Sequence, residues 1–329
     1  MKKILSFVLF ALAGLVLPLA AADPASFVPD KTPLICHLDG VRLSALPWIK
    51  EALAKDPEMA AKLKQSEAIY AQFGLSEKDL CSGAVYVAMT QDDAGAIFFK
   101  TNIPEAKFVP LVKAFLAKEE AGKDIVIDEK LLAGKKFYVF GGKDRKDEKG
   151  DDVFAVTYLA PDVIAGMSLD DAKAVLAAPA GRNPLLAKLD RSQLAALVFD
   201  PSLTKEKEEN PEITGVDLTI NLTGKAQKDL AIASNLVFPN EQKAMEAAQQ
   251  VQMSLPMLAG MIFGKDPDLA GDVMKGLKVT TPAKTRLNVR FALSEKTIDA
   301  IAKYFEKPEN LPDFGQKSVG GAEAAPAAK

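Results

Sequence analysis

The side chains of this sequence that commonly carry catalysis are few: one histidine, His37, and two cysteines, Cys36 and Cys81. A Ser-His-Asp triad needs its imidazole beside both a serine and an acid. No serine stands in the G-x-S-x-G pattern of a nucleophile elbow. The remaining nucleophilic candidate is a catalytic pair of Cys81 and His37. The alternative is that His37 is a structural residue of a strand, hydrogen-bonded to a neighbour. We favour the second interpretation and predict no catalytic residue.

Metal ligands are equally scarce. Zinc sites usually take several Cys or His ligands, and the chain holds only three such residues. Acids surround a glycine, as in calcium sites, at 144–152 and at Asp266, Asp268 and Asp272. Basic residues interleave with the first group, and the second lacks calcium-loop spacing. We therefore interpret them as a solvated loop and a helix cap, and predict no metal and no cofactor.

Cys36 and Cys81 have two interpretations. In an oxidising compartment an even pair of cysteines suggests a disulfide. Closing that loop would stabilise the fold by roughly 4 kcal/mol in the chain-entropy model. The alternative is two free thiols buried as small apolar residues.

A methionine row marks the most unusual stretch, residues 245–263. Met253, Met257 and Met261 recur at helical spacing, and Leu258 and Ile262 make the same segment apolar nearly all round. One interpretation is a helix buried between two parts of the chain. The other is a hydrophobic groove or an oligomer contact, because flexible methionines suit adaptable binding surfaces. We take these five residues as the candidate site for an unknown protein partner or an apolar ligand, and a homo-oligomer is compatible with it.

The N-terminus has the layout of a secretory signal peptide. Lys2 and Lys3 precede an apolar run from Ile4 to Leu19, and three alanines precede Asp23. We predict a signal peptide at 1–22 and a periplasmic or secreted protein. No later segment is apolar over a length that could span a bilayer, so we expect that the chain does not span a membrane after signal cleavage.

The composition is that of a globular protein, with 48% apolar and 26% charged residues. The formal net charge is −3, and no basic stripe with interleaved aromatics occurs, so we predict no nucleic-acid binding.

The order of predicted elements repeats along the chain. A strand, a hairpin near 84–101 and a helix from Glu105 recur as a strand near 194–199, a hairpin near 216–236 and a helix after Asn240. We predict an α+β fold of two tandem related units, at 23–180 and 186–308, each an antiparallel sheet with helices packed on one face. Residues 309–329 are Gly, Ala, Pro and charge, which predicts a disordered polar tail.

These patterns favour an exported, non-enzymatic binding or scaffold protein. The alternative is a carboxylate-dependent hydrolase of the cell envelope, because the separation of paired acids exists only in three dimensions.

Overall fold

A computed structural model describes residues 22–46, 57–89, 95–118, 124–142, 154–177, 180–204, 212–224, 228–305 and 307. Three expectations lie outside this range: the signal peptide apart from residue 22, the charged loop near 144–152, and the tail at 309–329.

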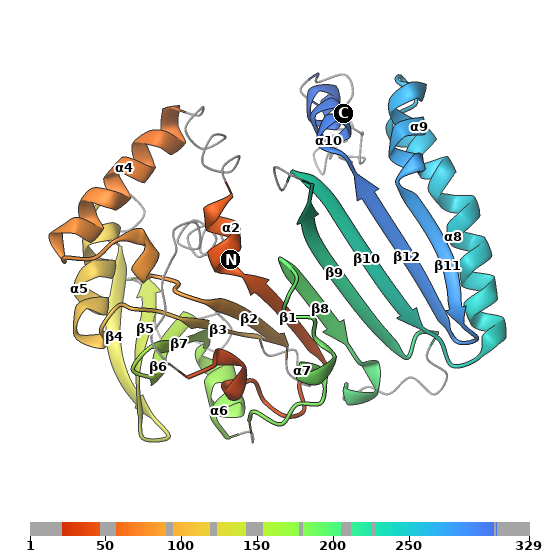
Figure 1. Ribbon diagram of the computed structural model, residues 1–329. Helices are drawn as coiled ribbons and strands as arrows, with labels where there is room; N and C mark the ends of the chain where they lie inside the picture. Colours follow the sequence, from red (N-terminus) through yellow and green to blue (C-terminus); the bar gives the residue numbers. More distant parts are fainter. Residues whose placement is uncertain are drawn as a thin grey trace, which may run out of the picture.

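The described residues build one large antiparallel sheet of twelve strands with several helices (Figure 1). The strands are β1 (Leu34–Asp39), β2 (Ala84–Met89), β3 (Gly95–Lys100), β4 (Ile125–Leu132), β5 (Lys135–Gly142), β6 (Phe154–Ala160), β7 (Val163–Ser168), β8 (Ala195–Phe199), β9 (Gly215–Thr223), β10 (Asp229–Val237), β11 (Leu277–Ala283) and β12 (Arg286–Leu293). Their spatial order is β11-β12-β10-β9-β8-β1-β2-β3-β7-β6-β5-β4.

The helical elements lie between the strands in sequence. They are α2 (Gly40–Ala45), α4 (Pro57–Gln72), α5 (Glu105–Leu116), α6 (Leu169–Ala177), α7 (Leu185–Lys188), α8 (Glu241–Ile262), α9 (Pro267–Lys275) and α10 (Glu295–Phe305), with 3-10 turns η1 (Pro24–Phe27), η2 (Glu77–Asp79) and η4 (Pro201–Leu203). Figure 1 shows α4 and α5 beside one end of the sheet and α8, α9 and α10 beside the other.

Local chemistry explains several boundaries. Asn240 begins α8, because its side chain accepts a hydrogen bond from the Lys243 amide. Pro57 stands at the start of α4, where a proline is tolerated. The β4–β5 hairpin turns through Ala133 and Gly134, both with positive φ, as a tight two-residue turn requires.

The pairing of β1 with β8 joins the two parts of the chain into one sheet. Leu34 pairs with Phe199, and Leu38 pairs with Ala195. The sequence left open whether two units would share a sheet or dock face to face, and the structure shows a shared sheet.

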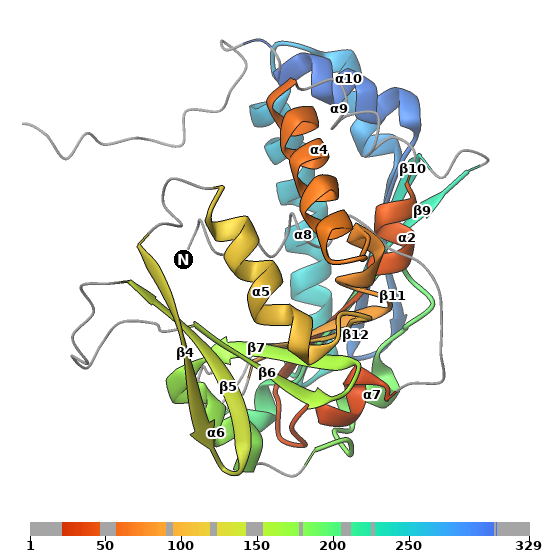
Figure 2. The same ribbon diagram turned by 90° about the vertical axis from the view of Figure 1, so that its left-hand side faces the viewer.

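Helices cover both sides of the sheet in the first part of the chain (Figure 2). Phe108 and Leu111 of α5 pack on Ile164 of β7. Val175 of α6 packs in a cluster with Ala165, the next residue of the same strand. Because neighbouring strand residues point to opposite faces, α5 and α6 lie on opposite sides, which we name the α5 face and the α6 face. The expectation of helices on one face therefore fails for this part.

At the other end of the sheet, α8 packs on the strands β11 and β12. Its Ala244 and Ala248 are buried against Leu287 of β12. Phe263, Leu269 of α9 and Tyr304 of α10 form a second cluster around Leu293. These contacts hold α8, α9 and α10 against the strands at this end of the sheet.

Candidate interaction surface

The middle of the α5 face carries a row of apolar side chains that remain partly exposed. The strand registers place them in three consecutive rungs across β2, β1, β8, β9 and β10. We name them the open sheet face: Leu34, Cys36, Val87, Met89, Leu197, Phe199, Val216, Leu218, Ile220 and Ile232.

The registers also show which helices border this surface. One rung starts at Phe99, which packs in the α5 cluster, and ends at Phe291, which packs in the cluster of α9 and α10. Between them the rung passes through Val85, Leu38, Ala195, Ile220 and Ile232. The open sheet face therefore lies between α5 on one side and the α8–α10 group on the other.

The opposite side is fully packed on β1, β2, β3 and β8, whereas β9 carries the partly buried polar residues Asp217 and Thr219 there. Ile35, Tyr86, Phe98 and Val198 are between 0% and 2% exposed. They form one cluster with residues of η1, α6 and α7, such as Ala25, Val175 and Leu185. On β1, β2 and β8 both faces are largely apolar, and the described residues cover the α6 face more fully than the α5 face, so the more exposed α5 face is the candidate for a ligand.

The α8 methionines form a second exposed apolar surface. Met253, Met257 and Met261 are 70%, 63% and 74% exposed, and Leu258 is 45% exposed. We name these four residues the methionine face; the three methionines lie on the side of α8 away from its buried alanines, and Leu258 lies at the border between the two sides. Ile262, the fifth predicted residue, packs instead in the interior cluster with Phe263 and Tyr304.

His37 is buried on the α6 face and not in a cleft. His37 is 3% exposed, its ring centroid lies 5.3 Å from that of Tyr86, and its Nδ1 atom has no hydrogen-bond partner among the described residues. Burial lowers the pKa of His37; the charges that act on it are Asp39, Arg191, Asp23 and Asp190. The predicted hydrogen bond to a neighbour is absent at Nδ1.

Both cysteines are free thiols on the α5 face. Cys81 packs against Leu38 and Val85, and its Sγ donates to the Gly83 carbonyl at 3.6 Å. His37 lies on the other side of β1, so the Cys81–His37 pair does not form. Burial raises the pKa of Cys81 to about 12 and also raises that of Cys36, which disfavours the reactive thiolate in both.

The acidic groups occupy capping and ion-pair positions. The Asp266 carboxylate accepts from the Leu269 amide at the start of α9, which confirms the helix-cap interpretation. Burial raises the pKa of Asp217, whereas the positive charges of Lys188 and Arg286 act to lower it. Across the described residues, no three His, Cys, Asp or Glu side chains converge as metal ligands would.

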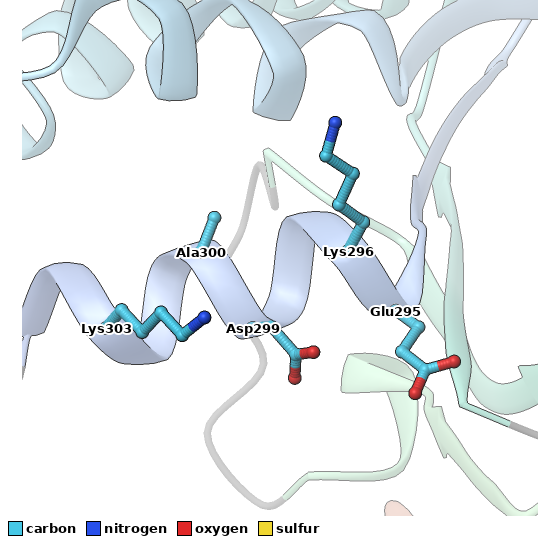
Figure 3. Close-up of a pocket in the computed structure, with 5 residues that line it drawn as sticks. All are labelled: Glu295, Lys296, Asp299, Ala300 and Lys303. Carbon is cyan, nitrogen blue, oxygen red and sulfur yellow. The ribbon is translucent and has the colours of Figure 1, made fainter.

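An open hollow of about 410 Å³ runs along α10 (Figure 3). Glu295 and Asp299 line it and point to the same side of the helix, together with Lys303. Glu295 accepts a hydrogen bond from the Lys228 ammonium at 2.7 Å. This arrangement gives two carboxylates near each other, but one of them is held by a lysine.

Protonation of His37 is expected to destabilise the fold. Because the folded-state pKa of His37 lies below its unfolded value of about 6.5, stability is full above pH 6.5 and falls as pH decreases from there to the folded-state pKa. The slope in that window reaches about 1.4 kcal/mol per pH unit. Urea unfolding between pH 7.5 and 5.5 measures it.

The matched variant for this prediction is His37→Gln. His37 is the only histidine of the chain, so the variant should have a nearly flat free energy of unfolding over the same pH range. Parallel pH profiles for the two proteins would contradict the prediction.

No helix in the described part of the chain has the length and apolarity needed to cross a membrane. Comparisons of the chain with protein-family models, with curated proteins and with solved structures gave no match.

Proposed function

We propose that this protein is exported and binds an apolar ligand without transforming it, on the open sheet face and the methionine face. The observation that carries the proposal is the contrast in cover between the two sides of the central strands. On β1, β2 and β8 the α6 face is buried, whereas the α5 face keeps its apolar side chains partly exposed among the described residues.

The strand pairing restricts what can bind to the open sheet face. The strands β1, β8 and β9 are each hydrogen-bonded to a neighbour on both sides. A peptide therefore cannot add to them as a further strand, and the occupant has only side chains to contact. Five adjacent strands span roughly 19 Å, which suits an extended aliphatic chain. We accordingly propose a ligand with a long acyl group.

The export of the protein is supported by residues 1–22 alone. Their positive start, apolar run and small residues before Asp23 support a periplasmic or secreted location. Mass spectrometry of the N-terminus of the protein recovered from its native cell envelope tests this point. Cleavage after residue 22 would support it, and an intact Met1 would oppose it.

We also propose that the chain arose by duplication. Outward from the β1–β8 pair, the strand order is β1-β2-β3-β7-β6 on one side and β8-β9-β10-β12-β11 on the other. In both parts the first hairpin is followed by a helix, α5 or α8, and the last hairpin by another, α6 or α10. The β4–β5 hairpin and α9 have no counterpart, and α6 and α10 pack on opposite faces.

Binding of a fluorescent long-chain fatty acid tests the proposed function. Leu218→Asp puts a charge in the centre of the open sheet face, and we expect it to weaken binding at least tenfold, since burying one leucine contributes about 1.5–3 kcal/mol. The matched control is Thr219→Asp, which changes the next residue on the opposite side of β9. Circular dichroism confirms that both variants fold.

A parallel pair tests the methionine face. Met257→Asp should also weaken probe binding, whereas Met245→Asp should not, although Met245 lies on the same helix and is 54% exposed. If Met257→Asp binds like the native protein, the methionine face is not part of the site. If the native protein does not bind the fluorescent fatty acid, the proposed ligand-binding function is wrong.

The hydrolase is the second candidate, because Glu295 and Asp299 line one hollow. Hydrolysis of an ester or a glycoside by the purified protein, abolished by Glu295→Gln or Asp299→Asn, would replace the binding proposal.

A further inference from the structure

The two outer edges of the sheet differ in a way that points to a partner. The strand β11, at one edge, contains Pro282, carries a register shift between Thr280 and Ala283, and packs against α8. Prolines, irregular pairing and covering helices are the usual means by which proteins protect an edge from pairing with another chain.

The strand β4, at the other edge, has none of these features. It pairs with β5 in unbroken register over its full length, and its outer side faces no other strand of the described sheet. Three of its apolar side chains are exposed, Leu131 at 75%, Val126 at 39% and Ile125 at 36%, whereas Ile127 and Leu132 are partly buried. A regular, exposed, partly apolar edge strand is a template for strand addition.

We propose that β4 pairs antiparallel with β4 of a second copy of this chain, so that the sheet continues across a two-fold axis at Glu129. The argument is the self-complementarity of the strand sequence, Ile-Val-Ile-Asp-Glu-Lys-Leu-Leu. With Glu129 on the axis, Asp128 faces Lys130 of the second copy, and Lys130 faces its Asp128.

The apolar residues match in the same register. Ile127 faces Leu131 of the second copy on the α5 face, and Val126 faces its Leu132 on the α6 face. Cross-strand pairs of opposite charge and of apolar side chains stabilise a sheet. The two Glu129 side chains meet on the axis, and each has a Lys136 ammonium 4.0 Å from its carboxylate to reduce the repulsion, although this ammonium lies closer to Glu105, at 3.3 Å.

Neighbouring registers lack this match. Residues that face each other in antiparallel strands point to the same side of the sheet. If each face continues across the dimer, the two-fold axis must pass through a residue, so the alternative registers place it one residue to either side. With the axis at Asp128, that residue faces itself and Val126 faces Lys130. With the axis at Lys130, that residue faces itself and Asp128 faces Leu132. The charge pattern of β4 therefore selects the axis at Glu129 and a second copy as the occupant.

Charge exchange tests the register. Sedimentation of the full chain over a concentration series should show a dimer. Lys130→Glu or Asp128→Lys should weaken it at least tenfold, because like charges then stand opposite each other twice. The double variant, Asp128→Lys with Lys130→Glu, should restore the dimer, and a mixture of the two single variants should form heterodimers.

A cross-link locates the axis. Glu129→Cys should form an intermolecular disulfide under mild oxidation, since paired strand residues lie about 4.5–5.5 Å apart at Cα. Lys130→Cys should cross-link far more slowly, as it lies off the axis. A chain that stays monomeric at every concentration overturns the proposal, as does a dimer that neither charge reversal weakens.

Discussion

Asn183→Ala is expected to lower the free energy of unfolding by about 3 kcal/mol. The Asn183 side chain is 4% exposed and makes three hydrogen bonds to the backbone. Its Nδ2 donates to the carbonyls of Pro29 and Thr32 at 2.9 and 3.0 Å, and its Oδ1 accepts from the Leu185 amide at 2.8 Å. Alanine removes the printed partner of the Thr32 carbonyl and of the Leu185 amide, at about 1–3 kcal/mol each before any relaxation, whereas the Pro29 carbonyl keeps the Thr32 amide at 3.2 Å.

The position of Asn183 explains why the effect should spread. The segment from η1 to β1 lies over the α6 face, where Ala25 and Val28 enter the main cluster. Asn183, with the Gly181 amide that donates to the Val28 carbonyl, fastens this segment to the residues before α7. Loosening it exposes apolar surface around β2 and β3.

Urea unfolding of Asn183→Ala beside Asn102→Ala measures this prediction. Asn102 is exposed and reaches Asp79 through a long contact of 3.4 Å, so its variant should change stability by less than about 0.5 kcal/mol. Equal effects in the two variants would show that the Asn183 bonds do not hold the N-terminal segment.

The sequence predicted the local elements well, because the signals for them are local. The strand Ala84–Met89 and the start of α8 after Asn240 are confirmed at the predicted residues. The α+β class and the antiparallel strand pairing are also confirmed, and the structure shows one large sheet. The prediction gave the acids around Gly271 a helix-cap role but did not place α9 or β11 after them.

The arrangement of the sheet could not be predicted in the same way. The strand β8 is apolar at every position from Ala195 to Phe199, which fits many partners and both faces equally. The pairing of β8 with β1 depends on residues far apart in the sequence. The placement of α5 and α6 on opposite faces depends on packing, which no local pattern records.

The part of the candidate site that has a local sequence signal was predicted, and the part that depends on packing was not. Helical periodicity placed Met253, Met257 and Met261 on one side of a helix, and the structure places these residues at the surface. The open sheet face was missed, although a signal existed. Strands that are apolar on both faces require cover on both, and the sequence supplies few helices to cover the middle of the α5 face.

Gly271 within α9 and Gly276, which caps the end of α9, should respond in opposite directions to the same substitution. Gly276→Ala is expected to destabilise the fold by about 3 kcal/mol, because overpacking against backbone forces a shift. A Cβ at Gly276 would overlap the carbonyl oxygen of Ala292 and come within 3.0 Å of its carbonyl carbon. The Ala292 amide donates to the Gly276 carbonyl at 3.0 Å, so the two backbones cannot separate without losing that bond.

Gly271→Ala is the matched control in the same helix. A Cβ there meets no atom within 4 Å, so alanine should stabilise the protein by about 0.5–1 kcal/mol through helix propensity. Thermal and urea unfolding of both variants measure the difference. The opposite signs depend on α9 running directly into β11 beside β12, an arrangement the sequence did not reveal. A Gly276→Ala variant as stable as the native protein would show that this close approach of the backbones is absent.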